Sequence, residues 1–310
     1  MDVVESTEAI REATEKARSG GDIVGFVPTM GALHRGHARL LRTARRECGF
    51  VALSIFVNPL QFNRREDLAT YPRTLHDDVV MAEALHVDVV FAPAEDEIYP
   101  GGRPEITVDP GPLGERLEGA ARPGHFRGVL TVVAKLLNLV GPCRAYFGEK
   151  DAQQLELVRR MVRSLDLPAT VVSCPTERDP DGLAISSRNA LLSPGQRRAA
   201  PVLFEALSDA ATRAREGEGN ADVLKAEMAR LIGSERLARL DYVAIVDDRT
   251  WEEVEEIHGP CRALVAAAFG DVRLIDNIAL PTPLTEPSGR AKREDQGTST
   301  VHNTVDEEEA

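Results

Sequence analysis

Residues 25–37, Gly-Phe-Val-Pro-Thr-Met-Gly-Ala-Leu-His-Arg-Gly-His, combine the end of a strand, a turn of small residues and the start of a helix. Residues 23–27 form a short apolar run with β-branched side chains, which is typical of a buried strand. Pro28 has no amide hydrogen to donate, so we expect strand pairing to end there. From Gly36 onward, apolar side chains recur at spacings of three and four, which predicts a helix.

A strand, a small-residue turn and a helix in this order predict an anion site. The first amides of a helix lack intrahelical partners and the helix dipole adds positive potential, so phosphate is favoured there. Gly31 and Gly36 allow the backbone to approach a ligand closely. His34 and His37 lie three residues apart, so they share one face of the first turn. Two imidazoles in this position can donate hydrogen bonds to oxygens that gain charge during phosphoryl or nucleotidyl transfer.

Two other interpretations of the histidine pair remain open at this point. Histidines three apart on a helix also occur as surface pairs or as half of a metal site. A zinc site would need further ligands, and the cysteines are scattered without Cys-x-x-Cys spacing, which makes that interpretation weak. They are Cys48, Cys143, Cys174 and Cys261.

The composition restricts the classes of function. The 310 residues are 43% hydrophobic and 28% charged, as in ordinary globular proteins that hold about two domains. A net charge of -13 disfavours general nucleic-acid binding through a basic surface. The N-terminus lacks the basic and apolar regions of a secretion signal, and no apolar run is long enough for a membrane span. Scattered, unpaired cysteines suggest a reducing compartment, so we expect a cytoplasmic protein without membrane partners.

Polar residues follow two further predicted strands. Residues 50–57 form a nearly continuous apolar run, and Asn58 and Gln61 come directly after it. Ligands bind beyond the carboxyl ends of strands in open α/β sheets, so these side chains should share a crevice with the histidines. The other interpretation is that they only cap a loop.

The second of these strands repeats the pattern of strand, glycine, polar cluster and helix. Residues 144–147 lead into Gly148 and Glu149, and then into Lys150, which can meet phosphate as a mobile point charge. Asp151 can cap the following helix or hold a metal ion. Gln154, one turn on, faces the same turn.

Two other polar groups are candidates for the site. Asp77 and Asp78 lie in the first turn of a predicted helix capped by Thr74, where acids favour the dipole, although a divalent ion is an alternative. Residues 175–190 read as a hinge. Within it, residues 186–188 place two hydroxyls beside an arginine, a combination suited to phosphate oxygens.

The chain changes character after this hinge. Residues 1–175 alternate strands and helices, which predicts an α/β domain with a Rossmann-like, doubly wound parallel sheet. Residues 176–282 read as a smaller α+β domain with helices first and three strands after them. Residues 283–310 are acidic and poor in apolar side chains, so we expect a disordered tail.

Taken together, the chain resembles the pantothenate synthetase (pantoate–β-alanine ligase) family, which belongs to the nucleotidyltransferase superfamily with the His-x-Gly-His signature. The resemblance runs from the first helix to about residue 280. The matching stretches are residues 28–37, 56–62, 71–74 (Tyr-Pro-Arg-Thr), 122–129, 147–154, 181–189 and 273–277.

The resemblance implies an ATP- and Mg²⁺-dependent reaction in two steps. Pantoate would attack the α-phosphate of ATP to give pantoyl adenylate and pyrophosphate, and β-alanine would then displace AMP. The resemblance also implies a homodimer. Other enzymes with the same signature, such as pantetheine-phosphate or nicotinamide-mononucleotide adenylyltransferases, and a nucleotide-binding regulator without chemistry, are the alternatives. The paired glutamines and the Tyr-Pro-Arg-Thr stretch argue against the first alternative.

The resemblance also implies roles for individual residues. His37 would be the proton donor, and His34, Lys150 and Arg188 complete the catalytic candidates. Gln61 and Gln154 would hold pantoate, with Gln61 also touching β-alanine, and Asn58, Tyr71 and Arg122 are further substrate candidates. Tentative metal ligands are Asp77, Asp78 and Asp151. The ATP-binding candidates are Met30, Gly31, Ala32, Leu33, His34, Arg35, Gly36, His37, Gly148, Glu149, Lys150, Asp151, Glu177, Ile185, Ser186, Ser187 and Arg188.

Two positions depart from the family pattern. Ile185 stands where methionine is usual, and Glu177 stands where a small apolar residue is common near adenine. Both changes are tolerable if the backbone makes these contacts.

Overall fold

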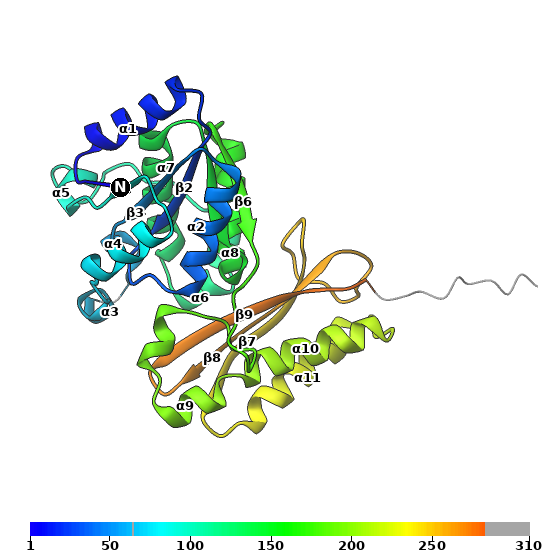
Figure 1. Cartoon of the computed structure of the whole chain (residues 1–310). Coiled ribbons are helices and arrows are strands. Elements are labelled where there is room, and N and C mark those ends of the chain that lie inside the picture. The colour runs from blue at the N-terminus through cyan, green and yellow to red at the C-terminus, as the bar shows by residue number, and fades with distance from the viewer. Residues whose placement is uncertain (64, 283–310) are drawn as a thin grey trace, which may run out of the picture.

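The computed structural model describes residues 1–63 and 65–282, which form one parallel and one antiparallel sheet (Figure 1). The expected acidic tail lies outside the described residues. None of the described helices is both long and apolar enough to cross a membrane.

The first sheet has six parallel strands in the order β1-β4-β3-β2-β5-β6. The strand that begins the opening motif, β2, therefore lies between β3 and β5, as expected for a doubly wound sheet whose strand order reverses at this point. The strands are β1 (Asp2–Val4), β2 (Val24–Thr29), β3 (Phe50–Ile55), β4 (Val89–Phe91), β5 (Cys143–Gly148) and β6 (Ala169–Cys174).

Helices cover both faces of this sheet. One core contains side chains of α1 (Thr7–Ser19), α7 (His125–Val140) and α8 (Ala152–Ser164). The opposite core contains side chains of α2 (Arg35–Glu47) and α4 (Leu75–Ala84). Shorter helices lie in the connections: η1 (Pro59–Gln61), α3 (Arg65–Thr70), α5 (Glu95–Ile98), η2 (Pro112–Glu115), α6 (Glu118–Ala121) and η3 (Glu149–Asp151).

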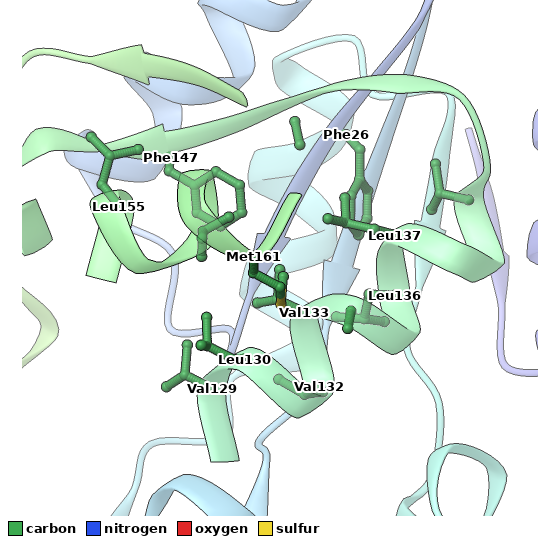
Figure 2. Packing of buried hydrophobic residues seen from close by; sticks show 14 of the residues in the cluster. Phe26, Val129, Leu130, Val132, Val133, Leu136, Leu137, Phe147, Leu155 and Met161 are labelled. Carbon is green, nitrogen blue, oxygen red and sulfur yellow. The ribbon is translucent and has the colours of Figure 1, made fainter. Parts of the chain in front are cut away.

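The buried helix α7 shows how the sequence builds the larger core. Its apolar side chains, with few charges among them, predict a helix that is buried on most sides. In Figure 2, leucines and valines of α7 point toward Phe26 of β2, Phe147 of β5 and Met161 of α8. Close packing at this place fixes the two strands whose carboxyl ends carry the site.

The expectation that pairing would end at Pro28 is wrong. Pro28 pairs in register with Ser54, and Thr29 pairs with Ile55. The carbonyl of Thr29 accepts from the amide of Phe56 (3.0 Å), and successive residues of a strand bond to opposite neighbours. The nitrogen of Pro28 therefore faces β5, where registered pairing stops at Phe26, and no ladder bond is lost.

The C-terminal part forms an antiparallel sheet in the order β7-β8-β9, with helices packed on one face. A core of leucine, alanine and isoleucine joins the helices to the sheet. The elements are η4 (Ser187–Leu191), α9 (Pro194–Ala199), α10 (Val202–Arg215), α11 (Ala221–Ser234), β7 (Ala238–Asp247), β8 (Cys261–Phe269) and β9 (Val272–Leu280). In Figure 1 the other face of this sheet lies against α6 and the lower end of the parallel sheet.

Candidate functional site

The His-x-Gly-His turn follows β2 and is held by reciprocal bonds between its two histidines. His34 is the N-cap of α2, and its Nδ1 accepts from the amide of Gly36 (3.1 Å). His37 Nδ1 accepts from the amide of His34 (3.3 Å). The two rings stack with their centroids 4.0 Å apart. The spacing therefore brings the imidazoles together, as expected.

These bonds also determine the protonation of the pair. Because each Nδ1 accepts a hydrogen bond, the proton of each neutral ring is on Nε2. Burial, followed by the charge of Lys150, lowers the pKa of His34 to about 4. Burial, followed by the neighbouring His34, lowers the pKa of His37 to about 3. Both rings are therefore neutral near pH 7 and offer Nε2–H groups as donors.

The carboxylate of Asp78 fixes the turn between β2 and α2. Its oxygens accept from the amides of Ala32 (3.0 Å) and Leu33 (2.7 Å), and from the hydroxyl of Thr74 (3.3 Å). Asp78 is only 2% exposed. The Thr74 side chain makes no cap bond to α4. These contacts favour the structural interpretation of Asp78 over the metal one, and Asp77 beside it is exposed.

The turn after β5 presents Lys150 and Asp151. The Lys150 Nζ lies 3.6 Å from an oxygen of Asp151, whose side chain is 50% exposed. Asp151 stands at the N-cap of α8 without making a side-chain cap bond, so the capping interpretation is wrong. Desolvation raises the pKa of Asp151, but Lys150 and Arg188 outweigh it and hold the pKa below its ordinary value. The carboxylate is thus charged and available.

The loop that precedes η4 folds back onto the first turn. The amide of Ile185 donates to the carbonyl of Glu177 (2.9 Å), which closes a short hairpin. Ser187 Oγ donates to the carbonyl of Ala32 (3.5 Å). Two ion pairs, Arg35–Asp179 and Arg39–Glu177, tie this hairpin to α2.

These ion pairs revise the view of Arg35 and Glu177. The Arg35 side chain donates to the carboxylate of Asp179 in the hairpin. The Glu177 carboxylate accepts from Arg39 (3.1 Å). Both side chains therefore have partners within the protein, which is consistent with a backbone contact at Glu177.

A cleft between α6, α8 and the C-terminal sheet is lined by five of the candidates: Arg122, Lys150, Asp151, Gln154 and Arg188. It measures about 460 Å³ with its open mouth included. Its lining contains three basic side chains that face one another: Arg122, Lys150 and Arg188. Gln154 lines it as well, whereas His34 and His37 lie beside it within reach of the charges of Lys150 and Asp151.

Arg122 is a cation without a carboxylate bonded to it in the described part of the chain. Its guanidinium donates to Nε2 of His125 (3.0 Å), while Nδ1 of His125 donates to the carbonyl of Gln61 (2.9 Å). Burial, followed by the charge of Arg188, lowers the pKa of Arg122 to about 10. Burial, followed by Arg122, lowers the pKa of His125 to about 3. A neutral imidazole thus holds a positive group ready for an anion.

Gln61 and Asn58 follow β3 as expected, and both are buried. Asn58 is 1% exposed, and its side chain bonds Tyr99 (2.8 Å), Gln61 (3.0 Å) and the carbonyl of Gly128 (3.1 Å). Asn58 Oδ1 also accepts from the amide of Leu60 (3.3 Å) and caps η1, so Asn58 both holds Gln61 and fits the interpretation of a loop cap. The Gln61 amide also donates to the sulfur of Met30 (2.8 Å), which joins β3 to the first turn.

Tyr71 lies at the third side of the site, next to the 186–188 loop. Burial raises its pKa, opposed by a hydrogen bond with Ser187 and by the charge of Arg188. Its ring meets Phe62 edge to face at 5.6 Å between centroids.

Several lining residues were not among the expected site residues. They are Glu118, His125, Phe126, Tyr242, Asp276 and Asn277. His125 and Asn277 lie inside stretches that carried the family resemblance, which was the available signal. Glu118 and Tyr242 lie in unrelated segments and carried no signal.

The comparisons agree with this geometry. The family model described as pantoate-beta-alanine ligase matches residues 2–279. A pantothenate synthetase from Chloroflexus aurantiacus is 53% identical over 267 residues, which cover 86% of this chain and 94% of the relative. One from Rubrobacter xylanophilus is 49% identical over 286 residues, which cover 90% and 98%.

Solved structures extend this likeness to the fold. A pantothenate synthetase from Thermus thermophilus superposes with a TM-score of 0.83 at 47% identity, covering 90% of this chain and 99% of that one. A pantoate-beta-alanine ligase from Francisella tularensis, complexed with beta-gamma ATP and beta-alanine, gives 0.73 at 35% identity, covering 90% and 97%. With a family model matched over residues 2–279 and relatives about 50% identical over most of their length, this chain belongs to the pantoate-beta-alanine ligase family.

Proposed function

We propose that the protein condenses pantoate with β-alanine at the expense of ATP, through a pantoyl-adenylate intermediate. One observation carries the assignment to this site: three loops, at residues 30–37, 148–151 and 186–188, converge beside a cleft rich in cations. The loops come from different parts of the chain, yet they lie close enough to interact electrostatically. Lys150 and Asp151 shift the pKa of His34, and Arg188 shifts the pKa values of Tyr71 and Asp151.

Side chains rather than turn amides would bind the phosphates. The amides of Gly31, Ala32, Leu33, His34 and Gly36 already donate within the protein. The Nε2–H groups of His34 and His37 and the cations Lys150 and Arg188 remain for phosphate oxygens. Ser186 and Ser187 lie beside Arg188, with Ser186 capping η4 through the Arg188 amide (3.3 Å).

The neutral state of His37 defines what it can contribute. With a pKa of about 3, it acts at neutral pH as a fixed hydrogen-bond donor and not as a pre-charged acid. Such a donor stabilises negative charge that develops on the phosphate oxygens in the transition state. His34 supplies a second donor of the same kind.

The two organic substrates would be held by uncharged amides and by Arg122. Gln61 and Gln154 offer donors and acceptors that suit a hydroxylated acid, and Arg122 suits a carboxylate. Pantoate carboxylate would attack the α-phosphorus while the bond to the bridging oxygen breaks and pyrophosphate leaves. The amine of β-alanine would then attack the acyl carbon, AMP would leave, and the amine would lose a proton.

Mg²⁺ fits the donors at Asp151 better than elsewhere. The ion is held in phosphate-transferring sites by one or two carboxylates together with substrate phosphates. Asp151 is charged, half exposed and beside Lys150, whereas the Asp78 oxygens are occupied by amides. No cluster of three metal-ligating side chains occurs among the described residues. The ion would neutralise phosphate charge.

We further propose a cytoplasmic homodimer, and a division of the chain near residue 175 into a nucleotide-binding part and a smaller lid. The family resemblance supports the first, and the C-terminal core, which contains only residues after 182, supports the second. Size-exclusion chromatography with light scattering measures the oligomeric state.

The assignment is tested by following the two half-reactions in order. ATP, Mg²⁺ and pantoate should release pyrophosphate before β-alanine is added, and β-alanine should then release AMP. Omitting pantoate should abolish both signals. Pyrophosphate release that needs nicotinamide mononucleotide or phosphopantetheine instead of pantoate would assign the chain to another adenylyltransferase class.

A further inference from the structure

We propose that Asn277 of β9 is a positioning residue, which holds the Lys150 turn in place from the C-terminal sheet. The proposal rests on the function above, in which Lys150 meets the phosphates of ATP. Asn277 lies in the 273–277 stretch, for which neither the residue pattern nor the resemblance supplied a role.

Two hydrogen bonds connect Asn277 with the turn. Its Nδ2 donates to the carbonyls of both Glu149 and Lys150, each at 2.9 Å. Asn277 is 5% exposed, so these bonds are shielded from water. One side chain thus binds two consecutive peptide units of a turn more than 120 residues away.

The orientation of the amide is fixed by a second pair of residues. Arg262 donates to Oδ1 of Asn277 (2.7 Å), and a guanidinium cannot accept, so the oxygen must face Arg262 and the nitrogen must face the carbonyls. Asp248 holds Arg262 through two bonds of 2.7 and 3.1 Å. Asp248, Arg262 and Asn277 form a chain of contacts that ends on the backbone of Lys150.

Gly148 at the start of the turn pairs with β6, whereas Lys150 and Asp151 face the cleft that they line. Gly148 has open space where a Cβ would lie, and the Asp151 side chain does not cap α8. Two hydrogen bonds from a rigid strand therefore restrain the turn. A displacement of about 1 Å at a substrate-positioning group can cost about 100-fold in rate.

The preceding residue performs a parallel task on the other loop. Asp276, 4% exposed, accepts two bonds from Arg178 (2.5 and 2.9 Å), and Arg178 also donates to the carbonyl of Gly182 (3.0 Å). This hairpin leads directly into Arg188. Two consecutive residues of β9 thus contact the supports of both phosphate-binding cations.

Asn277→Asp is the informative variant. The carboxylate keeps the shape of the side chain and can pair with Arg262, but it turns two donor contacts into repulsion against carbonyls. We expect ATP affinity, measured by calorimetry, to fall at least tenfold. Pantoate-dependent pyrophosphate release should fall 10- to 100-fold in kcat. The KM for β-alanine should stay within twofold.

Controls separate positioning from general damage. Arg160→Gln removes a different contact between the same two parts, a bond from Arg160 to the carbonyl of Thr250, and should leave both readouts within twofold. Asn277→Ala, which removes the donors without adding charge, serves if the aspartate variant does not fold. A merely structural role would lower the active fraction and leave the ATP Kd of the folded protein unchanged.

The outcomes are distinct. Wild-type ATP affinity in both Asn277 variants would overturn the positioning role. Wild-type protein that binds ATP but releases no pyrophosphate with pantoate would instead overturn the proposed function, while the ATP binding comparison would still decide the role of Asn277.

Discussion

At the scale of single residues, the histidine pair shows how local backbone geometry sets chemistry. His34 and His37 each accept a backbone amide through Nδ1, so their remaining ring protons point away from the turn on Nε2. Desolvation keeps both rings uncharged. The pair therefore provides hydrogen-bond donors whose orientation costs no reorganisation when the reaction begins.

Replacing His37 by alanine should cripple adenylation while the fold remains. Losing one transition-state donor costs about 100- to 1000-fold in kcat. Pre-steady-state pyrophosphate release measures the step, and circular dichroism checks the fold. The exposed His258, far along the chain, provides His258→Ala as a matched control. Turnover near wild type in folded His37→Ala protein would remove His37 from the mechanism.

Acid should destabilise the free protein through three histidines whose pKa values are lowered in the folded state. His34, His37 and His125 have folded pKa values of about 4, 3 and 3, below the ordinary 6.5. Between these values and 6.5 the unfolded chain binds more protons, so the free energy of unfolding should fall as pH drops below 6.5. Above pH 7 these histidines should no longer make the free energy of unfolding depend on pH.

Nitrogen-15 NMR of histidine-labelled protein measures this directly. The Nε2–H tautomer of His34 and His37 should persist to pH 5. Titration of either ring near pH 6.5 would contradict the assignment of neutral donors.

Gly148 allows a test of ligand approach. Its φ of −79° suits any residue, and a Cβ would meet no atom within 4 Å, so neither strain nor packing within the protein requires glycine there. We expect Gly148→Ala to leave the melting temperature unchanged and to raise the KM for ATP about tenfold, because the methyl group would occupy ligand space. Gly233→Ala on α11, another uncrowded position, is the control. An unchanged KM would place ATP elsewhere.

At the scale of elements, sequence patterns predicted most helices and strands because these depend on neighbouring residues. Strand β1 was missed, since three residues give too little pattern to recognise. The helical segment that follows the hinge divides at Pro201 into α9 and α10, as a proline inside a helix favours. At Pro28, by contrast, the proline does not end the strand. Its effect depends on which neighbouring strand its nitrogen faces, and residues close in the sequence do not determine this.

The turn before α2 depends on Asp78, and this gives a test that separates two interpretations of the acidic residues. Asp78→Ala removes charged acceptors from two amides, so it should lower the free energy of unfolding by about 2–4 kcal/mol. The Mg²⁺ concentration that the Asp78→Ala variant needs for pyrophosphate release should be unchanged. Asp151→Asn should do the opposite: near-normal stability and a raised Mg²⁺ requirement. Urea denaturation and Mg²⁺ titration measure the two effects, and reversed results would make Asp78 the metal ligand.

At the scale of the whole molecule, the sequence could predict the strand ends that carry the site but not the contacts between the two sheets. Gln61, Lys150 and Gln154 come after strands that lie next to β2. Because the strands are parallel, these residues were expected close to one another. The contacts between the two sheets depend on side chains more than 100 residues apart, such as Glu118 and Arg273. Neither residue type nor spacing identifies such partners in a single sequence.

The Glu118–Arg273 pair should hold the two parts together. Arg273 donates twice to Glu118, at 2.7 Å each, and once to Asp241 (2.7 Å), while the Tyr242 hydroxyl donates to Glu118 (3.0 Å). Glu118 is 6% exposed, so without Arg273 its carboxylate would be left poorly hydrated, whereas Arg273 keeps Asp241 as a second partner. Removing one partner of such a pair costs more than removing both, because the other charge is left buried.

A double-mutant cycle measures this coupling. Glu118→Gln and Arg273→Met should each lower the free energy of unfolding, and the double variant should lose less than the sum of the two, with a coupling of about 1–3 kcal/mol. The cycle Asp209→Asn with Arg213→Gln, which breaks an exposed ion pair within α10 (2.6 Å), should give a smaller coupling of about 0.3–0.5 kcal/mol. Glu118 also lines the cleft. Each single variant should therefore weaken the contact between the C-terminal sheet and the site, and lower kcat for adenylation. Additive losses in stability would show that the pair is incidental and that the β9 contacts to the two loops hold the parts together without it.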